Sequence, residues 1–123
     1  MQRFQPSVAL VKVPVTDFAR GRAFYTEVLG LEEEFAEAAY GWAQYRCGEI
    51  PLCLYVVGMG GGDGVPGGET NFHLAVSDIE AAYTLLQERG VAFQCELVKS
   101  DDGGSFFMVA DPDGNTFKIV QGE

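Results

Sequence analysis

The sequence predicts an α+β fold made of two copies of one unit, in which a strand, a helix and three further strands follow one another. Three observations support this prediction. The same order of periodic segments occurs twice, a glycine-rich joint at residues 58–68 separates the two occurrences, and the Val-Thr-Asp of residues 15–17 matches the Val-Ser-Asp of residues 76–78. Such a repeat indicates one supersecondary unit that is used twice. The half-repeats run over about residues 7–57 and 70–121 of a single predicted domain, residues 1–123.

The first half-repeat opens at residues 8–13, a run rich in β-branched residues that predicts a strand, which Pro14 interrupts near its end. Thr16 and Asp17 supply helix N-cap chemistry, and Gly30 stands where a helix C-cap glycine is favoured. Apolar positions recur at helical spacing between them, at Phe18, Gly21, Tyr25 and Val28. Three further strands are predicted over residues 31–38, 42–47 and 51–57.

The second half-repeat follows the same order. Residues 70–76 predict a strand, and Ser77 with Glu80 forms a capping-box motif before an amphipathic helix. The Asp-Pro-Asp-Gly of residues 111–114 predicts a turn between the last two strands. The three predicted strands after the helix cover residues 92–98, 105–110 and 116–120.

Composition and charge limit the classes of function. A net charge of −10 argues against nucleic-acid binding, because phosphates need a basic surface. No apolar run reaches the roughly 20 residues of a transmembrane helix, and residues 1–6 do not form a secretory signal. We therefore expect a cytoplasmic protein with no membrane partner. The cysteines form neither a disulfide framework nor a zinc pattern and are expected to act as small buried hydrophobes: Cys47, Cys53 and Cys95.

Two motifs carry a resemblance to a known superfamily. The first combines Asp17-Phe18, Phe24-Tyr25 and the Val-Leu-Gly-Leu of residues 28–31, and the second is the Asp-Pro-Asp-Gly-Asn of residues 111–115. With these motifs around a repeat, the chain resembles the vicinal oxygen chelate superfamily of glyoxalases, extradiol dioxygenases and bleomycin-resistance proteins. The resemblance implies that eight strands curl into an open cup with the helices outside. It also implies a site inside the cup and a homodimer.

The resemblance further implies where metal ligands would lie. At the strand positions that members use for His, Glu or Gln ligands, this chain has Leu10, Asn71 and Lys118, and Leu54 is the best candidate for the fourth. Leucine cannot ligate, protonated lysine has no acceptor, and an Asn carbonyl alone is a weak ligand. The sole histidine, His73, does not make a chelate site by itself. We therefore expect no metal and no other cofactor.

Strand alternation indicates which residues line the cup, because successive side chains point to opposite faces. The first, fifth and last predicted strands each have a consistently apolar face and a mixed face, and the mixed face contains the ligand positions of the superfamily. A mixed face with apolar walls and a few polar groups predicts a small-molecule site. Its predicted ligand-binding residues are Leu10, Lys12, Trp42, Gln44, Leu54, Asn71, His73 and Lys118.

Three functions stay open on these residues. The leading hypothesis is a metal-independent protein that binds a small molecule in the cup, similar to the antibiotic-sequestering members of the superfamily. The alternative is a lyase, isomerase or dioxygenase-like enzyme of the same superfamily, with His73 as general base and Lys118 stabilising an oxyanion. The third is a module that only dimerises. The acid excess favours a cationic ligand, whereas Lys12 and Lys118 favour an anionic or carbonyl group.

Overall fold

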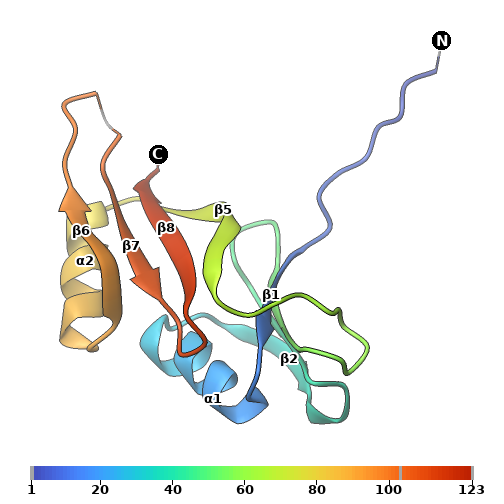
Figure 1. Ribbon diagram of the computed structural model, residues 1–123. Helices are drawn as coiled ribbons and strands as arrows, with labels where there is room; N and C mark the ends of the chain where they lie inside the picture. Colours follow the sequence, from blue (N-terminus) through green and yellow to red (C-terminus); the bar gives the residue numbers. More distant parts are fainter. Residues whose placement is uncertain (1, 103, 123) are drawn as a thin grey trace.

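The computed structural model describes residues 2–102 and 104–122, and it contains the two predicted half-repeats (Figure 1). The first half-repeat consists of β1 (Val11–Val15), α1 (Phe18–Ala23), the π-helical turn η1 (Phe24–Val28), β2 (Glu33–Glu37), the 3₁₀ turn η2 (Ala38–Tyr40), β3 (Trp42–Tyr45) and β4 (Leu52–Val56). The second consists of β5 (Gly68–Val76), α2 (Ile79–Glu88), β6 (Ala92–Val98), β7 (Phe106–Ala110) and β8 (Asn115–Gln121). The predicted fold class is confirmed.

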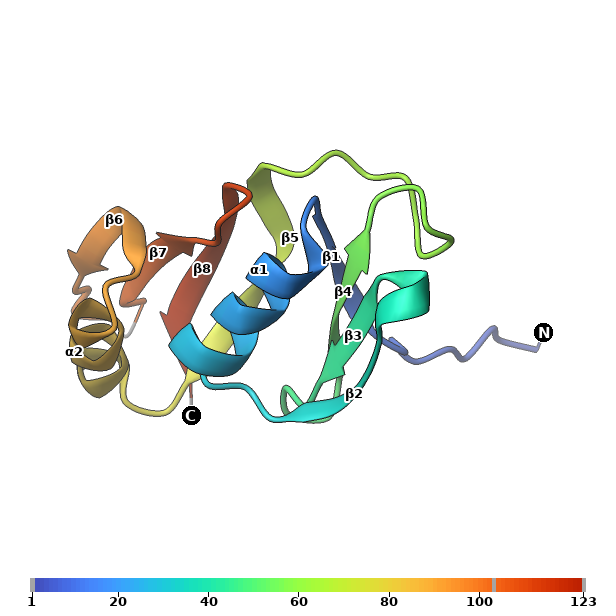
Figure 2. The same cartoon turned by 90° about the horizontal axis from the view of Figure 1, so that it is seen from below.

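The strands form two four-stranded sheets, one from each half-repeat. Their orders are β1-β4-β3-β2 and β5-β8-β7-β6. In both sheets the first strand of the half-repeat pairs in parallel with the last, and the other pairs are antiparallel. β1 and β5 lie side by side where the half-repeats meet, but they are not hydrogen-bonded to each other (Figures 1 and 2). The eight strands of the expected cup are therefore divided between two sheets.

Helix α1 lies between the two sheets, and α2 covers the outer end of the second sheet (Figure 2). The predicted apolar face of the first helix is turned inward, because Gly21 and Tyr25 are buried. The ring of Tyr25 lies 6.1 Å from that of Tyr45 on β3 and 5.9 Å from that of Phe117 on β8, measured between centroids. One helical residue thus joins the cores of both sheets. No helix within residues 2–102 and 104–122 is long and apolar enough to cross a lipid bilayer.

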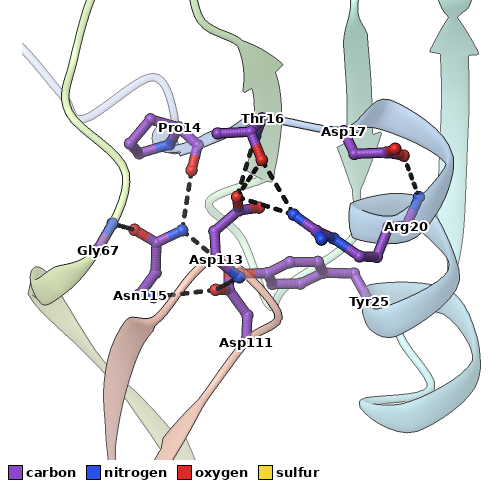
Figure 3. Close-up of polar contacts among 9 residues, drawn as sticks. All are labelled: Pro14, Thr16, Asp17, Arg20, Tyr25, Gly67, Asp111, Asp113 and Asn115. Atoms are coloured by element: carbon purple, nitrogen blue, oxygen red, sulfur yellow. Dashed lines mark hydrogen bonds and ion pairs between the residues drawn. The ribbon is translucent and has the colours of Figure 1, made fainter.

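A buried polar cluster joins the helix of the first half-repeat to the turn between β7 and β8 (Figure 3). The Tyr25 hydroxyl donates to the Asp111 carboxylate at 2.7 Å, and the side-chain amide of Asn115 donates to the same carboxylate at 2.9 Å. That amide also donates to the carbonyl of Pro14 at 2.8 Å. Burial and the neighbouring Asp111 carboxylate raise the pKa of Tyr25 well above its usual value near 10. The phenol therefore stays protonated and remains a donor.

Asp113 extends this cluster to the beginning of α1. Its Oδ1 accepts hydrogen bonds from the backbone N–H of Thr16 and from the Arg20 guanidinium, each at 3.2 Å. The Asp113 side chain is almost fully buried, whereas that of Arg20 is half exposed. The two half-repeats are therefore held by side-chain hydrogen bonds as well as by the apolar core. The sequence had predicted only a turn at these residues.

Two local predictions are wrong in detail. The first strand covers Val11–Val15 and not residues 8–13: it begins three residues later than predicted and continues past Pro14, which lies opposite Tyr55. Proline is tolerated there because β1 is an edge strand, where one N–H has no ladder partner. The N-cap of α2 is Asp78 and not Ser77: the Asp78 carboxylate accepts from the backbone N–H of Ala81 at 3.1 Å. The predicted capping box therefore begins one residue too early.

Candidate functional site

The open faces of the two sheets, defined as the faces turned away from α1 and α2, carry the candidate site. On β8, Phe117 and Ile119 are buried toward the helices, while Lys118 between them is half-buried on the open face. On β5, Asn71 and His73 are exposed and alternate with half-buried apolar residues. The predicted apolar and mixed faces of both strands are confirmed, and His73 and Lys118 face away from the helices as expected.

Six of the eight predicted site residues lie on the open faces, and they belong to four strands of the two sheets: β1, β3, β5 and β8. Leu10 is half-buried and precedes β1 by one residue, so it has no partner in the strand ladder. Leu54 is buried in the core. The remaining predicted residues are on the open faces: Lys12, Trp42, Gln44, Asn71, His73 and Lys118.

The prediction that Leu54 lines the cup is wrong. Leu54 is fully buried in the core, and a Cβ on Gly21 of α1 would lie 3.6 Å from its Cδ1. Its ladder partners Val13 and Ala43 are core residues too. The open face of β4 instead carries Cys53 and Tyr55, which the sequence analysis did not select. Every residue of β4 is apolar, so this strand has no alternation from which its phase could be predicted.

A cavity of about 440 Å³ lies where β1, β5 and the linker (residues 58–67) meet, and we call it the junction pocket. It brings together two of the predicted residues, Lys12 and Asn71, and adds Tyr55. These side chains come from both half-repeats, so only the tertiary structure makes them neighbours. The junction pocket combines the ammonium of Lys12, the amide of Asn71, the phenol of Tyr55 and the acidic Glu69 with apolar walls.

Trp42 lies in a second cavity of about 350 Å³, which we call the aromatic pocket. Its other side chains are Phe35, Tyr40 and Met59, which are 49%, 66% and 42% exposed, and the carboxylate of Glu37. None of these four residues was predicted from the sequence, because a lone exposed side chain in a strand or turn carries no periodic signal. The aromatic pocket offers π faces and one negative charge to a ligand.

Gln44 is separated from both pockets and is already hydrogen-bonded. Its amide donates to Glu34 at 3.2 Å, and the Cys53 thiol donates to its carbonyl at 3.4 Å. Burial, and secondarily the Glu34 carboxylate, raise the pKa of the Cys53 thiol to about 11. Cys53 is therefore protonated near neutral pH and is not an activated nucleophile.

His73 and Lys118 are paired in the register of β5 and β8. The Lys118 ammonium lies 4.2 Å from the ring centroid of Phe106, a cation–π geometry. Within residues 2–102 and 104–122, neither His73 nor Lys118 has a side-chain hydrogen bond or an ion pair. His73 lines a further cavity of about 460 Å³ with apolar walls from Val11 and Ile50. Glu49 also lines this cavity, and Lys118 is not among its lining residues.

The sequence profile of the Glyoxalase/Bleomycin resistance protein/Dioxygenase superfamily matches residues 7–119. The chain belongs to this superfamily. A solved superfamily member from Sphaerobacter thermophilus DSM 20745 is 27% identical, with a TM-score of 0.82 over 96% of this chain and 98% of that one. TnmS3, an antibiotic binding protein from Streptomyces sp. CB03234, is 28% identical, with a TM-score of 0.74 over 99% and 100% of the two chains.

A lactoylglutathione lyase from Agrobacterium tumefaciens has the same fold, with a TM-score of 0.77 over 96% of this superfamily member and 95% of the lyase. At 18% identity, that similarity concerns the fold alone. A comparison with curated protein sequences finds no significant match. Superfamily membership therefore fixes the fold and leaves the ligand to be argued from the site.

The residues at the metal-ligand positions of the superfamily do not fit a divalent ion. Leu10 has no donor atom, and the ammonium of Lys118 would repel a cation. No group of three or more His, Cys, Asp or Glu side chains that could hold a metal ion occurs in the described part of the chain. A divalent ion would therefore find neither a carboxylate nor an imidazole at Leu10, Asn71 and Lys118.

Proposed function

We propose that this superfamily member binds a small organic molecule on the open faces of its sheets without a metal ion. The observation that carries the proposal is the set of residues at the ligand positions: Leu10, Asn71 and Lys118 stand where a carboxylate or an imidazole would be needed. The junction pocket, which Asn71 lines, and the aromatic pocket combine apolar walls with a few polar groups, as small-molecule sites do.

The similarity to TnmS3 supports binding as the function. TnmS3 is described as an antibiotic binding protein, and its similarity to this chain extends over the full length of both. A protein that sequesters its ligand needs affinity and no reacting groups. The protonated Cys53 thiol and the absence of a hydrogen bond on His73 within the described residues agree with that requirement.

One observation favours a second candidate function, an enzyme that uses His73 as general base and Lys118 to stabilise an oxyanion. The two residues are ladder partners, so an imidazole and an ammonium stand side by side on the open face. No third group orients the imidazole among the described residues. Turnover of a bound compound that is abolished by both His73→Ala and Lys118→Met would select this candidate over pure binding.

The proposed assembly is a homodimer, in which a second copy packs against this chain. Residues 2–9 form an extended N-terminal arm that projects from the body (Figure 1), and all of them are exposed. Phe4 and Val8 in this arm are 91% and 63% exposed. Each sheet also has an edge strand at its outer end, β2 in the first and β6 in the second, and such edges are normally covered or paired.

The single tryptophan gives a direct test of binding, because Trp42 lines the aromatic pocket. The purified chain is titrated with planar aromatic compounds in neutral, cationic and anionic forms. We expect a saturable change in Trp42 fluorescence and a rise in melting temperature with at least one of them, since a ligand that binds only the folded state stabilises it. Native mass spectrometry then gives the stoichiometry independently of the fluorescence.

The same sample tests independence from metal. Elemental analysis is expected to find no stoichiometric Zn, Ni, Fe or Mn, and treatment with a chelator is expected to leave the affinity unchanged. Binding that appears only after a metal is added would contradict the proposal. So would the absence of saturable binding across the whole set of compounds.

A further inference from the structure

We infer that Lys12 recognises an oxygen acceptor of the ligand, a carboxylate or a carbonyl group, in the junction pocket. This inference rests on the proposed function and names the chemistry of one subsite. The pocket lies where β1 of the first half-repeat, β5 of the second and the linker meet. Lys12 points away from the helices there, since its neighbours Val11 and Val13 face the core.

The Lys12 ammonium is held in place before any ligand arrives. It donates to the carbonyl of Gly61 at 2.7 Å and lies 4.9 Å from the ring centroid of Tyr55. Lysine has three N–H donors, and this is its one hydrogen bond among the described residues. Two donors therefore remain for a ligand. A free lysine side chain loses much rotamer freedom on binding, and fixing it beforehand reduces that loss.

The linker is shaped to keep this carbonyl in position. A Cβ added to Gly61 would lie 2.7 Å from the Cβ of Tyr55 and 3.1 Å from Cε3 of Trp42, so only glycine allows the backbone this close. The backbone N–H of Gly64 donates to the Tyr55 hydroxyl at 3.1 Å. The linker is thus seated directly on β3 and β4, where the Gly61 carbonyl accepts from Lys12.

The other polar groups in the junction pocket favour the same kind of ligand. The Tyr55 hydroxyl accepts from Gly64, and its own proton is left to donate. The side-chain amide of Asn71 also lines the pocket and can donate. Glu69 is the one acidic residue in the lining, and Lys12 forms no ion pair among the described residues. The pocket therefore offers several donors to an acceptor, although Glu69 is in its lining and the protein as a whole carries a charge of −10.

The test compares three probes of similar size: 2-naphthoate, its methyl ester and 2-naphthylmethylammonium. We expect naphthoate to bind the wild-type chain about tenfold to a hundredfold more tightly than the ammonium compound, with the ester between them, because a charge-assisted hydrogen bond contributes on that order. Affinities are measured by calorimetry or by ligand-observed NMR.

Two variants separate the charge of Lys12 from its position. Lys12→Met keeps the length of the side chain and removes the ammonium, so we expect the preference for naphthoate to disappear. Gly61→Ala keeps the ammonium but pushes away the carbonyl that holds it, so we expect a partial loss of about tenfold or less. Lys99→Met is the matched control: Lys99 is exposed, pairs with Glu80 and does not line the pocket, so the preference should persist.

The outcomes distinguish the inference from the function on which it rests. If another aromatic compound binds the wild-type chain but none of these three probes does, the subsite alone fails; if no compound binds, the proposed function fails with it. If probes bind but naphthoate is not preferred, or if its preference survives Lys12→Met, the subsite alone is overturned. Circular dichroism melting of each variant confirms that a lost preference does not result from unfolding.

Discussion

At the residue scale, Lys118 allows ligand binding to be separated from folding. Its ammonium lies over the ring of Phe106 on the open face and has no ion pair among the described residues. Lys118→Met keeps the apolar stem and removes the charge. We expect the free energy of unfolding to fall by no more than about 1 kcal/mol, the size of an exposed cation–π contact. The affinity for an acceptor-bearing ligand should fall about tenfold to a hundredfold.

Urea denaturation and calorimetric titration measure these two quantities on the same protein. Lys99→Met again serves as the control for the loss of one surface charge. Unchanged affinity together with a large loss of stability would assign Lys118 to the fold and remove it from the candidate site.

Tyr25 represents the opposite case, a polar residue that serves the fold. Tyr25→Phe removes the hydroxyl that donates to the buried Asp111 carboxylate. We expect the free energy of unfolding to fall by about 1–3 kcal/mol, because a buried acceptor loses a partner. Tyr40→Phe is the control: Tyr40 is 66% exposed, so its change should stay within about 0.5 kcal/mol. Equal effects in urea denaturation would contradict the role given to Tyr25.

The raised pKa of Tyr25 gives this residue a signature in the pH dependence of stability. Burial and Asp111 hold the pKa of the folded state well above 10, whereas the unfolded chain loses the phenolic proton near 10. Above about pH 10 the folded state therefore binds more protons, and the free energy of unfolding falls as the pH rises. We expect a shallower fall in Tyr25→Phe. Identical slopes for the two proteins in alkaline denaturation would show that Tyr25 titrates normally.

At the element scale, the beginning of α2 tests a correction that the structure makes to the sequence analysis. Asp78 caps the helix, and Ser77 precedes it. We expect Asp78→Ala to lower the free energy of unfolding by about 0.5–2 kcal/mol, because one N–H of the first helical turn loses its acceptor. Ser77→Ala should change it by less than about 0.5 kcal/mol. A larger effect of Ser77→Ala in thermal denaturation would restore the predicted capping box.

The strands show which features a local sequence pattern predicts correctly and which it does not. In β1, β5 and β8, polar residues such as Lys12, His73 and Lys118 alternate with apolar ones, and this alternation correctly predicted the open face. In β4 no polar residue marks the phase, so Leu54 was placed on the wrong face. The correct phase is set by pairing with β1 and β3 on either side, which a single strand cannot encode.

At the scale of the whole molecule, the exposed arm leads to a prediction about assembly. We expect sedimentation at micromolar concentration to give a species of twice the 13.3 kDa chain mass. Removing residues 2–9 should shift it toward the monomer without a loss of folded structure, because these residues precede β1 and are all exposed. A full-length chain that sediments only as 13.3 kDa would contradict the dimer, and an equally stable truncated dimer would place the interface elsewhere.

The sequence by itself determined the two half-repeats, the order of their elements and the open faces of the alternating strands. The elements and the open faces depend on spacing within a segment of about ten residues, and the repeat is visible because the same order of elements occurs twice. The tertiary structure decided which of the candidate residues meet. Lys12 reaches a carbonyl 49 residues away, and Tyr25 reaches a carboxylate 86 residues away. Such contacts depend on how two sheets and a linker pack together, and no periodic pattern within one segment specifies that packing.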